Sequence, residues 1–506
     1  MKNYLLYTLL LLSYSCTSQE SISKSAWTGS ITIFGQTEYA LLDQQGDSLI
    51  LNLPDRGPDA KYLISNIRVS NTKNYFQTQV DRQDWQFEGN TLFPNQLEGK
   101  LVLENGLQGR FHFYKVESSK SEDWFPCSGT YQLPSGEFLI VWDNNGRIRM
   151  HSALSQQYTR LQAIGPVEFY SSSCERLKFL QKEGDKYQAL EWISSDGQSL
   201  PASRVADIRI EEHLIITDAD TIGASLYLPN QVGKHPACII PMGAANYDRS
   251  INDLEAKIFA AYGIATLIYD NYGSGKSSGS PQGKTFDDKQ AQTVELYRWL
   301  QKHPEIDPEK IGIRGASQGG RIAVMAGAVV DPAFLVLIAT PMETRMDQQL
   351  YALAAYHRQL GYLEEAIVQS SEIWRRFFLS AASGKVDTVL VEMAQVFASQ
   401  YPDMQIPRPV LQHPPQLPWT SDILSNTSSY LPNVNAPIQC IFGPLDDRVP
   451  AQKSIHILRT TLEANGKNPP EVILYEGTSH SFMLPGFRIV PGLFMDQVRF
   501  MKRALQ

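Results

Sequence analysis

Cysteine, basic tracts and long apolar runs are all scarce in this sequence, and each scarcity argues against a class of proteins. Five cysteines occur among 506 residues, and no pair of them has the spacing of a zinc site. The net charge is -8 and no basic tract is present, so we expect no nucleic-acid partner. The apolar run at residues 4–12 is too short to span a bilayer. Nothing in the composition calls for a metal or a cofactor, and we expect neither.

The start of the chain has the layout of an export signal. Lys2 supplies a positive charge, the short apolar run follows, and small residues lead to Cys16. This order resembles a bacterial lipoprotein signal, although Ser13 stands where leucine is usual. The resemblance implies a signal peptide at residues 1–16 and membrane attachment through a lipid on Cys16; the alternative is an ordinary secretory signal. Both predict an exported protein, either a lipoprotein of a bacterial envelope or a periplasmic or secreted protein.

The other four cysteines fall into two pairs of different character. Cys127 and Cys174 lie in the N-terminal region and are candidates for a disulfide bond if the protein is outside the cytoplasm. Cys238 and Cys440 lie inside apolar, strand-like runs, so we expect buried thiols there.

The N-terminal third of the chain has the pattern of an all-β region. Short alternating runs recur between turn signals, for example at residues 27–33, 111–114 and 137–142. The stretch at 121–126 predicts a boundary between one β module at 25–120 and a second at 121–204. Neither module contains a nucleophile with a base, so we expect a structural or positioning role; a ligand-binding role is the alternative.

From residue 205 onward the pattern changes to that of an α/β domain. Residues 208–217 and 221–228 predict a hairpin. Further apolar runs alternate with helical segments, and their continuous hydrophobicity is typical of a mostly parallel sheet covered by helices. These strand predictions are residues 237–240, 264–269, 311–313, 334–338, 437–442 and 472–475, and a final amphipathic helix is expected at 493–505.

The alternation of strands and helices breaks between residues 342 and 435. Helical patterns at 346–360, 364–379 and 387–399 precede a proline-rich stretch at 407–418. An insertion of this kind commonly covers a site, so we expect a helical lid at 342–435 within a hydrolytic domain at 205–506.

A Gly-x-Ser-x-Gly turn at Gly315 to Gly319 lies between an apolar strand pattern and a helix of small residues. This is the sequence form of a nucleophile elbow, a sharp turn that exposes a serine hydroxyl at the end of a strand. The glycines are needed because a Cβ at either position meets the neighbouring backbone. Ser317 is therefore the candidate nucleophile.

A serine nucleophile needs a base and a carboxylate that orients the base. Only His456 and His480 follow the insertion, and His480 lies in a small loop after the last strand, so we assign it as the base. His456 lies in a helical pattern, where we expect a partly buried packing residue. The loop after the preceding strand offers Asp446 and Asp447; the spacing favours Asp446, and Asp447 stays the alternative.

The tetrahedral intermediate of such a reaction needs two backbone N–H donors. The residue after the nucleophile, Gln318, supplies one. The second is expected from the loop after the strand at 237–240, and Ala244 is the best placed.

These motifs together resemble the α/β-hydrolase superfamily, in its serine-aminopeptidase-like or acyl-hydrolase branch of secreted bacterial esterases. The stretch at 243–249 is similar to the family's His-Gly-Ser-Gly-Pro-x-Asp-Arg loop, and the stretch at 269–277 to its Asp-x-Arg-Gly-x-Gly-x-Ser turn. Met242 replaces the usual histidine, Ala245 and Asn246 replace Gly-Pro, and Tyr272 replaces the family's arginine. The oxyanion hole is formed by the two backbone N–H groups named above, so we expect it to survive these side-chain changes.

The stretch at 273–277 also imitates a phosphate-binding loop. A P-loop needs a glycine where Asp270 stands, and a dinucleotide fingerprint needs one at Ser278. We therefore interpret the stretch as a structural turn near the rim of the site.

The sequence predicts a serine hydrolase that cleaves a carboxylic ester or thioester through an acyl-enzyme on Ser317, with His480 and Asp446 completing the triad. The alternatives are a serine peptidase or aminopeptidase of the same fold, or a catalytically silent surface binding protein. The substrate is expected to be a small acyl ester or a peptide.

Overall fold

The computed structural model describes residues 26–70, 73–93, 95–118, 124–143, 146–205, 207–218, 220–244, 247–281, 284–385, 387–407, 422–484 and 488–506. The predicted signal peptide with Cys16 and most of the proline-rich stretch lie outside these residues, as do Ala245 and Asn246.

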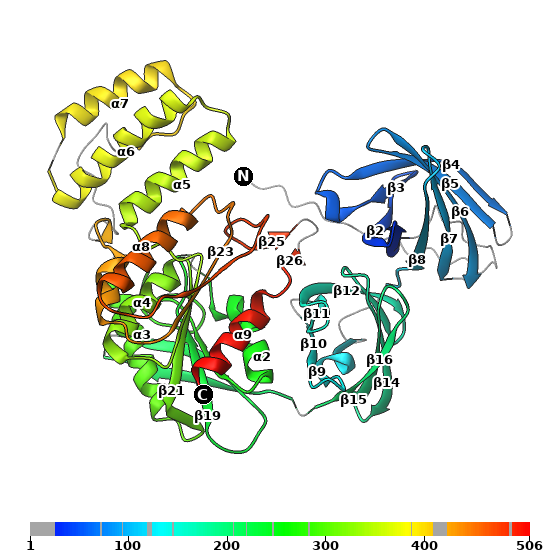
Figure 1. Cartoon of the computed structure of the whole chain (residues 1–506), viewed down its shortest axis with the longest axis horizontal. Helices are drawn as coiled ribbons and strands as arrows, with labels where there is room; N and C mark the ends of the chain where they lie inside the picture. The colour runs from blue at the N-terminus through cyan, green and yellow to red at the C-terminus, as the bar shows by residue number, and fades with distance from the viewer. Residues whose placement is uncertain are drawn as a thin grey trace. The chain divides into compact units, whose positions relative to one another are not determined.

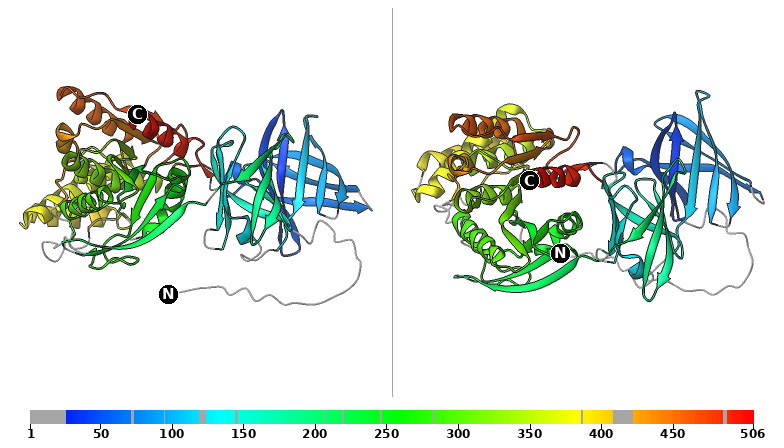
Figure 2. Two further views of the ribbon diagram at one scale, coloured as in Figure 1. Left: turned by 90° about the horizontal axis from the view of Figure 1, so that it is seen from below. Right: turned by 60° about the horizontal axis from the view of Figure 1, so that its bottom comes forward.

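The first part of the chain closes into an antiparallel barrel, drawn in blue in Figures 1 and 2. The alternating sequence places one face of each strand inward, where stacked aromatic rings such as Phe76 and Phe87 fill the interior. Its strands are β1 (Trp27–Ile33), β2 (Gln36–Gln45), β3 (Ser48–Asn52), β4 (Lys61–Ser70), β5 (Lys73–Val80), β6 (Gln83–Phe93), β7 (Gln96–Leu103) and β8 (Gln108–Lys115).

A second closed barrel follows, in which the last strand returns to pair with the first. Tyr131 is buried at this seam, and its hydroxyl donates a hydrogen bond to the carbonyl of Cys127 at 3.0 Å. The strands are β9 (Gly129–Gln132), β10 (Phe138–Asp143), β11 (Ile148–Ser152), β12 (Gln157–Gly165), β13 (Glu168–Ser171), β14 (Arg176–Glu183), β15 (Lys186–Ile193) and β16 (Ser199–Arg204). The expected all-β region is therefore two barrels.

The remainder of the chain contains a mixed, mostly parallel sheet in the order β17-β18-β20-β19-β21-β22-β23-β24. The predicted hairpin is confirmed as an antiparallel pair, and β18 also pairs antiparallel with β20, whereas the other pairs are parallel. The strands are β17 (Arg209–Ile216), β18 (Thr221–Leu228), β19 (His235–Ile240), β20 (Ala265–Tyr269), β21 (Ile306–Ala316), β22 (Leu335–Ile338), β23 (Ile438–Phe442) and β24 (Glu471–Leu474).

Helices cover this sheet, as Figure 1 shows for α2 and α9 beside β19 and for α3, α4 and α8. Inner strands such as β20 and β23 are buried along their whole length, which explains why their sequences are mostly apolar. The buried Gln439 in β23 is satisfied by a hydrogen bond from its Nε2 to Glu471. The helices are α2 (Asp253–Ala261), α3 (Phe286–Gln301), α4 (Gln318–Val330), α8 (Ala451–Ala464) and α9 (Leu493–Ala504).

The insertion between β22 and β23 forms the helices α5 (Arg345–Gln359), α6 (Glu364–Ser383) and α7 (Thr388–Gln400). They pack around an apolar cluster of their own, which includes Phe377, Phe378 and Phe397. The insertion is thus a small helical body with its own core, in yellow and yellow-green in Figure 1.

Contacts divide the chain into two compact units. The first contains residues up to 120 together with 161–178 and 193–198, and the second contains the rest, so the division passes through the second barrel. Among the described residues, no helix has the length and apolar character needed to cross a membrane.

Candidate active site

Ser317 lies at the tip of the turn between β21 and α4, in a strained backbone conformation. Its φ of 53° and ψ of -122° fall where a residue with a side chain is rare. A Cβ on Gly315 clashes with the carbonyl oxygen of Gly319, and a Cβ on Gly319 lies 2.5 Å from the carbonyl oxygen of Pro241. The turn therefore closes only with glycine at both positions, which is the physical content of the motif.

Asp446 and His480 come together across the loops that follow β23 and β24. His480 Nδ1 lies 2.8 Å from Asp446 Oδ2, and the other oxygen, Oδ1, accepts the backbone N–H groups of Arg448 and Val449 at 2.8 Å each. Asp446 is 2 % exposed, so three hydrogen bonds hold a buried carboxylate in one orientation. The imidazole of His480 is positioned by that carboxylate.

A close approach of the two loops explains this meeting. The N–H of Leu445 donates to the carbonyl of Thr478 at 3.0 Å, and a Cβ on Gly443 lies 2.5 Å from that same oxygen. Only a glycine at 443 lets the loop after β23 lie directly on the loop after β24.

The topology places Ser317, Asp446 and His480 at the same edge of the sheet. They follow β21, β23 and β24, which run parallel with β22 between the first two. The carboxyl ends of parallel strands meet at one edge, where open α/β sheets bind ligands. Among the described residues, the hydroxyl of Ser317 has no hydrogen-bond partner, so its pairing with His480 stays a prediction.

The backbone around the elbow leaves two N–H groups available near the serine. Gln318 opens α4, where the first N–H groups have no partner within the helix. The loop at 241–244 packs against this helix start, since the carbonyls of Pro241 and Met242 lie against Gly319. Neither Gln318 nor Ala244 donates its N–H to an acceptor among the described residues. Both remain free to hold a developing negative charge.

A cluster of cations lies beside the elbow, and nothing in the sequence pattern indicated it. Lys289 on α3 donates from Nζ to Gln318 Oε1 at 2.9 Å. Burial, with the nearby charge of Arg345, lowers the pKa of Lys289 to about 8. Arg345 in turn lies 3.4 Å from Asp422 and stacks over the ring of Phe286. Sequence spacing gave no signal because these residues come from three distant segments.

Side chains of α5 contact the loop that carries the acid. Tyr351 donates from its hydroxyl to the carbonyl of Asp446 at 2.8 Å, and Gln348 Nε2 donates to the carbonyl of Arg448 at 3.0 Å. Gln359 Nε2 donates to Asp447 Oδ2 at 3.0 Å. Asp447 thus points to the insertion, whereas Asp446 points to His480.

The turn that imitates a phosphate-binding loop is built around a buried carboxylate. Asp270 is fully buried, accepts the backbone N–H groups of Arg249 and Lys276 at 2.8 and 2.7 Å, and is paired with the guanidinium of Arg249. Gly275 has a φ of 53°, and a Cβ there clashes with that carboxylate. The interior of the turn is filled by Asp270, which supports its interpretation as structural.

His456 is exposed on α8, so the prediction of a partly buried packing residue is wrong. The helix turns its apolar side, including Ile455 and Leu458, toward the sheet, and His456 follows on the opposite side. Cys238 and Cys440 are buried as expected, and burial raises the pKa of each thiol to about 12.

The other two cysteines do not form the disulfide that the sequence left as an option. Cys127 and Cys174 are both buried, and neither is joined in a disulfide. Burial raises the pKa of Cys127 to about 12.

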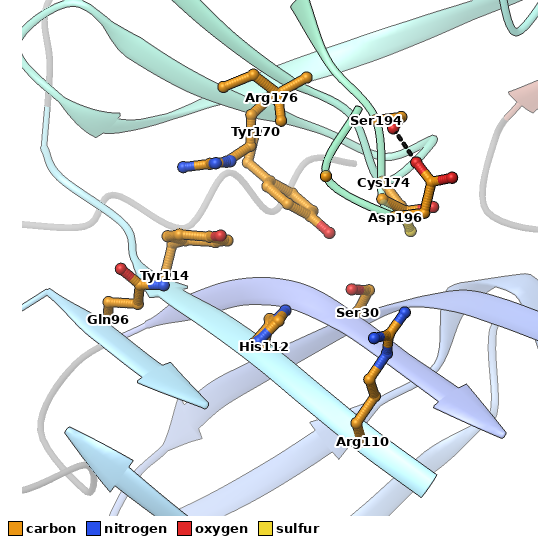
Figure 3. Close-up of a pocket in the computed structure, with 13 residues that line it drawn as sticks. Ser30, Gln96, Arg110, His112, Tyr114, Tyr170, Cys174, Arg176, Ser194 and Asp196 are labelled. Atoms are coloured by element: carbon orange, nitrogen blue, oxygen red, sulfur yellow. Dashed lines mark hydrogen bonds between the residues drawn. The ribbon is translucent and has the colours of Figure 1, made fainter. Parts of the chain in front are cut away.

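A pocket of about 210 Å³ lies in the β region, within the first compact unit. Figure 3 shows Arg110, His112 and Ser30 on one side, and Tyr170 and Arg176 on the other. His112 is paired with Glu98 at 2.8 Å, and Arg176 stacks over Tyr114. Serines and His112 line this pocket, but the carboxylate among its lining residues, Asp196, is exposed, whereas Asp446 near the elbow is buried.

Comparison with known proteins gives one family match. The model of the X-Pro dipeptidyl-peptidase (S15) family matches residues 218–481, which is more than half of the chain. This stretch contains the elbow, both catalytic-loop candidates and the insertion.

Individual relatives are more distant. An uncharacterized protein of Mycobacterium tuberculosis is 25% identical over 323 residues, covering 63% of this chain and 85% of that protein. The thiohydrolase aneE of Aspergillus aculeatus is 23% identical over 312 residues, covering 58% and 93%. Among solved structures, a proline iminopeptidase of Mycobacterium smegmatis has a TM-score of 0.38 with 16% identity, covering 58% of this chain and 99% of its own.

Proposed function

The chain belongs to the X-Pro dipeptidyl-peptidase (S15) family, and from this premise we propose that it is a serine hydrolase that cleaves a carboxylic ester or thioester through an acyl-enzyme on Ser317. The observation that carries the proposal is the buried Asp446, whose Oδ2 lies 2.8 Å from His480 Nδ1, at the sheet edge where a strained turn carries the half-buried Ser317. An α/β-hydrolase with these groups in this chain order has the parts that acyl transfer needs.

The proposed reaction has two steps. His480 Nε2 takes the proton of the Ser317 hydroxyl as its oxygen attacks the substrate carbonyl, while the N–H groups of Gln318 and Ala244 hold the oxyanion. Collapse of the tetrahedral intermediate breaks the ester bond, and His480 protonates the leaving alcohol or thiol. Water then attacks the acyl-enzyme in the same way and releases the acid. Each oxyanion donor of this kind typically lowers the barrier by roughly 3–4 kcal/mol.

We further propose that the insertion acts as a lid over this site. Support comes from its separate core and from the hydrogen bonds of Tyr351 and Gln348 to the loop that carries Asp446. Tyr351→Phe removes one of these bonds without changing the ring. We expect it to change kcat/KM more for long-chain than for short-chain acyl esters, and an equal effect on both would contradict a lid role for this contact.

The test of the chemistry is Ser317→Ala, measured with p-nitrophenyl acetate and butyrate and with a fluorophosphonate probe. We expect hydrolysis and labelling to be lost, because the probe reacts only with an activated serine. Ser481→Ala, which changes an exposed serine beside His480, is the matched control and should keep both. Undiminished hydrolysis by Ser317→Ala would end the proposal, and failure of the wild-type protein to label would favour a silent binding protein.

A peptidase is the second candidate, and the family itself favours it. Its name describes cleavage after an X-Pro dipeptide, and the same triad can attack an amide. An X-Pro p-nitroanilide and an aminoacyl p-nitroanilide, run beside the ester panel, separate the two candidates. A kcat/KM higher for either anilide than for every ester would assign the chain to peptidases.

We also propose that the protein is exported and anchored by a lipid on Cys16, on the sequence grounds given above. Cys16→Ser should move the protein from the membrane to the soluble fraction of its bacterial host. Unchanged membrane fractionation of this variant would contradict the anchor.

A further inference from the structure

We propose that Glu211, His213 and His303 form a binding site for a divalent transition-metal cation, with Zn²⁺ as the reference ion. The three side chains each offer one ligand atom, and these atoms all lie within 4.8 Å of one another. The site lies within the hydrolase sheet and its helices, and it is independent of the proposed catalytic groups.

The distances match those that zinc requires. Ligand atoms at about 2.0–2.1 Å from a tetrahedral zinc lie about 3.3 Å from one another. Glu211 Oε2 lies 3.2 Å from His303 Nε2 and 3.4 Å from His213 Nε2. The two imidazole nitrogens lie within 4.8 Å of each other, so a small rotation of the partly exposed His213 ring is enough to bring them to that separation. Two imidazoles and one carboxylate with an open fourth position are a ligand set that zinc accepts.

The fold presents these atoms together for a simple reason. Glu211 and His213 are two residues apart on β17, so their side chains lie on the same face of the strand. His303 follows the end of α3, and Trp299 on that helix packs edge-on against His213 with ring centroids 4.8 Å apart. The helix end and the edge strand are thus held in register before any ion binds.

The surrounding charged groups do not occupy the atoms that would bind the ion. Arg209 contacts the other oxygen of Glu211, Oε1, at 3.3 Å and is itself paired with Glu305. Oε2 therefore remains directed to the imidazoles. His213 Nε2 is buried and has no hydrogen-bond partner of good geometry in the described part of the chain. A metal ion bound here would give this buried nitrogen a partner.

His303 has one competing contact. The backbone N–H of Glu305 donates to His303 Nδ1 at 3.4 Å, which places the ring proton on Nε2. Metal binding at Nε2 moves that proton to Nδ1 and gives up this long, weak bond. The ring keeps its place because Trp299 and Glu211 hold it.

The site's position assigns it a stabilising role. The backbone carbonyl of Glu305 accepts the N–H of His235, the first residue of β19, at 2.8 Å. The cluster beside Glu305 therefore lies at the edge of the sheet where the parallel strands begin. Ser317 lies at the opposite, carboxyl edge. An ion here ties the edge strand β17 to the end of α3 without contacting the substrate.

The experiment uses the full chain, freed of metal with a chelator and dialysed against micromolar Zn²⁺. We expect one zinc per chain by elemental analysis, a visible d–d absorption with Co²⁺ in place of zinc, and a rise of a few degrees in Tm on adding Zn²⁺. His213→Ala and His303→Ala should each weaken zinc binding at least tenfold and abolish the rise. His456→Ala, which removes an exposed histidine from α8, is the matched control and should change neither.

Two outcomes overturn the proposal. One is the absence of stoichiometric zinc from the wild-type protein, which would make the cluster a His–Glu ion pair only. The other is equal zinc binding by the wild type and both variants. If either alanine variant fails to fold, Glu211→Gln, which keeps the side-chain shape, replaces it with the same expectation. Ester hydrolysis should be the same with and without zinc, because the site lies at the far edge of the sheet.

Discussion

Asp446→Asn tests the assignment of the acid most sharply, because the structure dictates which way the new amide points. In the wild type, Asp446 Oδ1 accepts two backbone N–H groups, from Arg448 and Val449, and Oδ2 faces His480 Nδ1. An asparagine keeps the two backbone bonds only with its carbonyl oxygen at the Oδ1 position. Its NH₂ group is then directed at His480 Nδ1.

This orientation inverts the tautomer of the base. An amide that donates to Nδ1 requires Nδ1 to be unprotonated, so the neutral ring carries its proton on Nε2. In the proposed reaction, Nε2 accepts the proton of Ser317, and a proton already on Nε2 blocks this step. An amide at this position of a Ser-His-Asp triad typically lowers kcat about 10⁴-fold, which corresponds to about 5.5 kcal/mol in the barrier.

The assay is p-nitrophenyl butyrate hydrolysis, with Tm measured in parallel. We expect the large fall in kcat for Asp446→Asn with little change in Tm, since the backbone bonds to the loop persist. Asp447→Asn is the matched control: it alters one contact with Gln359 and should change kcat less than twofold. A fall confined to Asp447→Asn, or a fall of less than tenfold in Asp446→Asn, would refute the tautomer argument.

Three further predictions concern the elbow and two buried basic groups. Gly315→Ala should lower the free energy of unfolding by about 1–3 kcal/mol and kcat at least tenfold, because the new Cβ clashes with the carbonyl oxygen of Gly319. Gly165→Ala is the control: its Cβ lies 3.6 Å from its nearest neighbour, so neither quantity should change. Urea unfolding and ester assays of both variants check this. Burial lowers the pKa of His151 to about 3, so its contribution to stability is complete above pH 6.5 and is lost as pH falls toward 3, by about 5 kcal/mol. His151→Leu should flatten this acid branch in urea titrations, and an unchanged slope would contradict it. Burial lowers the pKa of Lys289 from 10.5 to about 8, so the wild type should gain up to about 3 kcal/mol as pH rises from 8 to 10.5. Lys289→Met should lack that gain, and parallel curves for the two proteins would show that Lys289 titrates normally.

Local sequence patterns were sufficient to predict those features whose structure depends on residues close together in the chain. The first glycine of the elbow was readable because a Cβ on Gly315 clashes with the carbonyl of Gly319, four residues along the chain. The second, Gly319, is required by the carbonyl of Pro241, which only the fold brings close. The strands of the parallel sheet were readable because burial on both faces makes their sequences mostly apolar, even though Thr266 and Gln439 are buried among them. The burial of His456 was predicted wrongly, because a helical pattern alone does not say at which angle the helix docks.

The sequence by itself determined that this chain has an all-β region followed by an α/β domain with a tight Gly-x-Ser-x-Gly turn between a strand and a helix, because periodicity and glycine spacing are local properties of the chain. Tertiary structure decided what depends on distance across the fold. It closed the β region into two barrels, directed Asp446 rather than Asp447 at His480, and placed Lys289 against Gln318. It also brought His303 to Glu211, 92 positions away in the sequence. The physical reason is the same in each case: these contacts join segments that only the packed sheet and helices bring within hydrogen-bond reach.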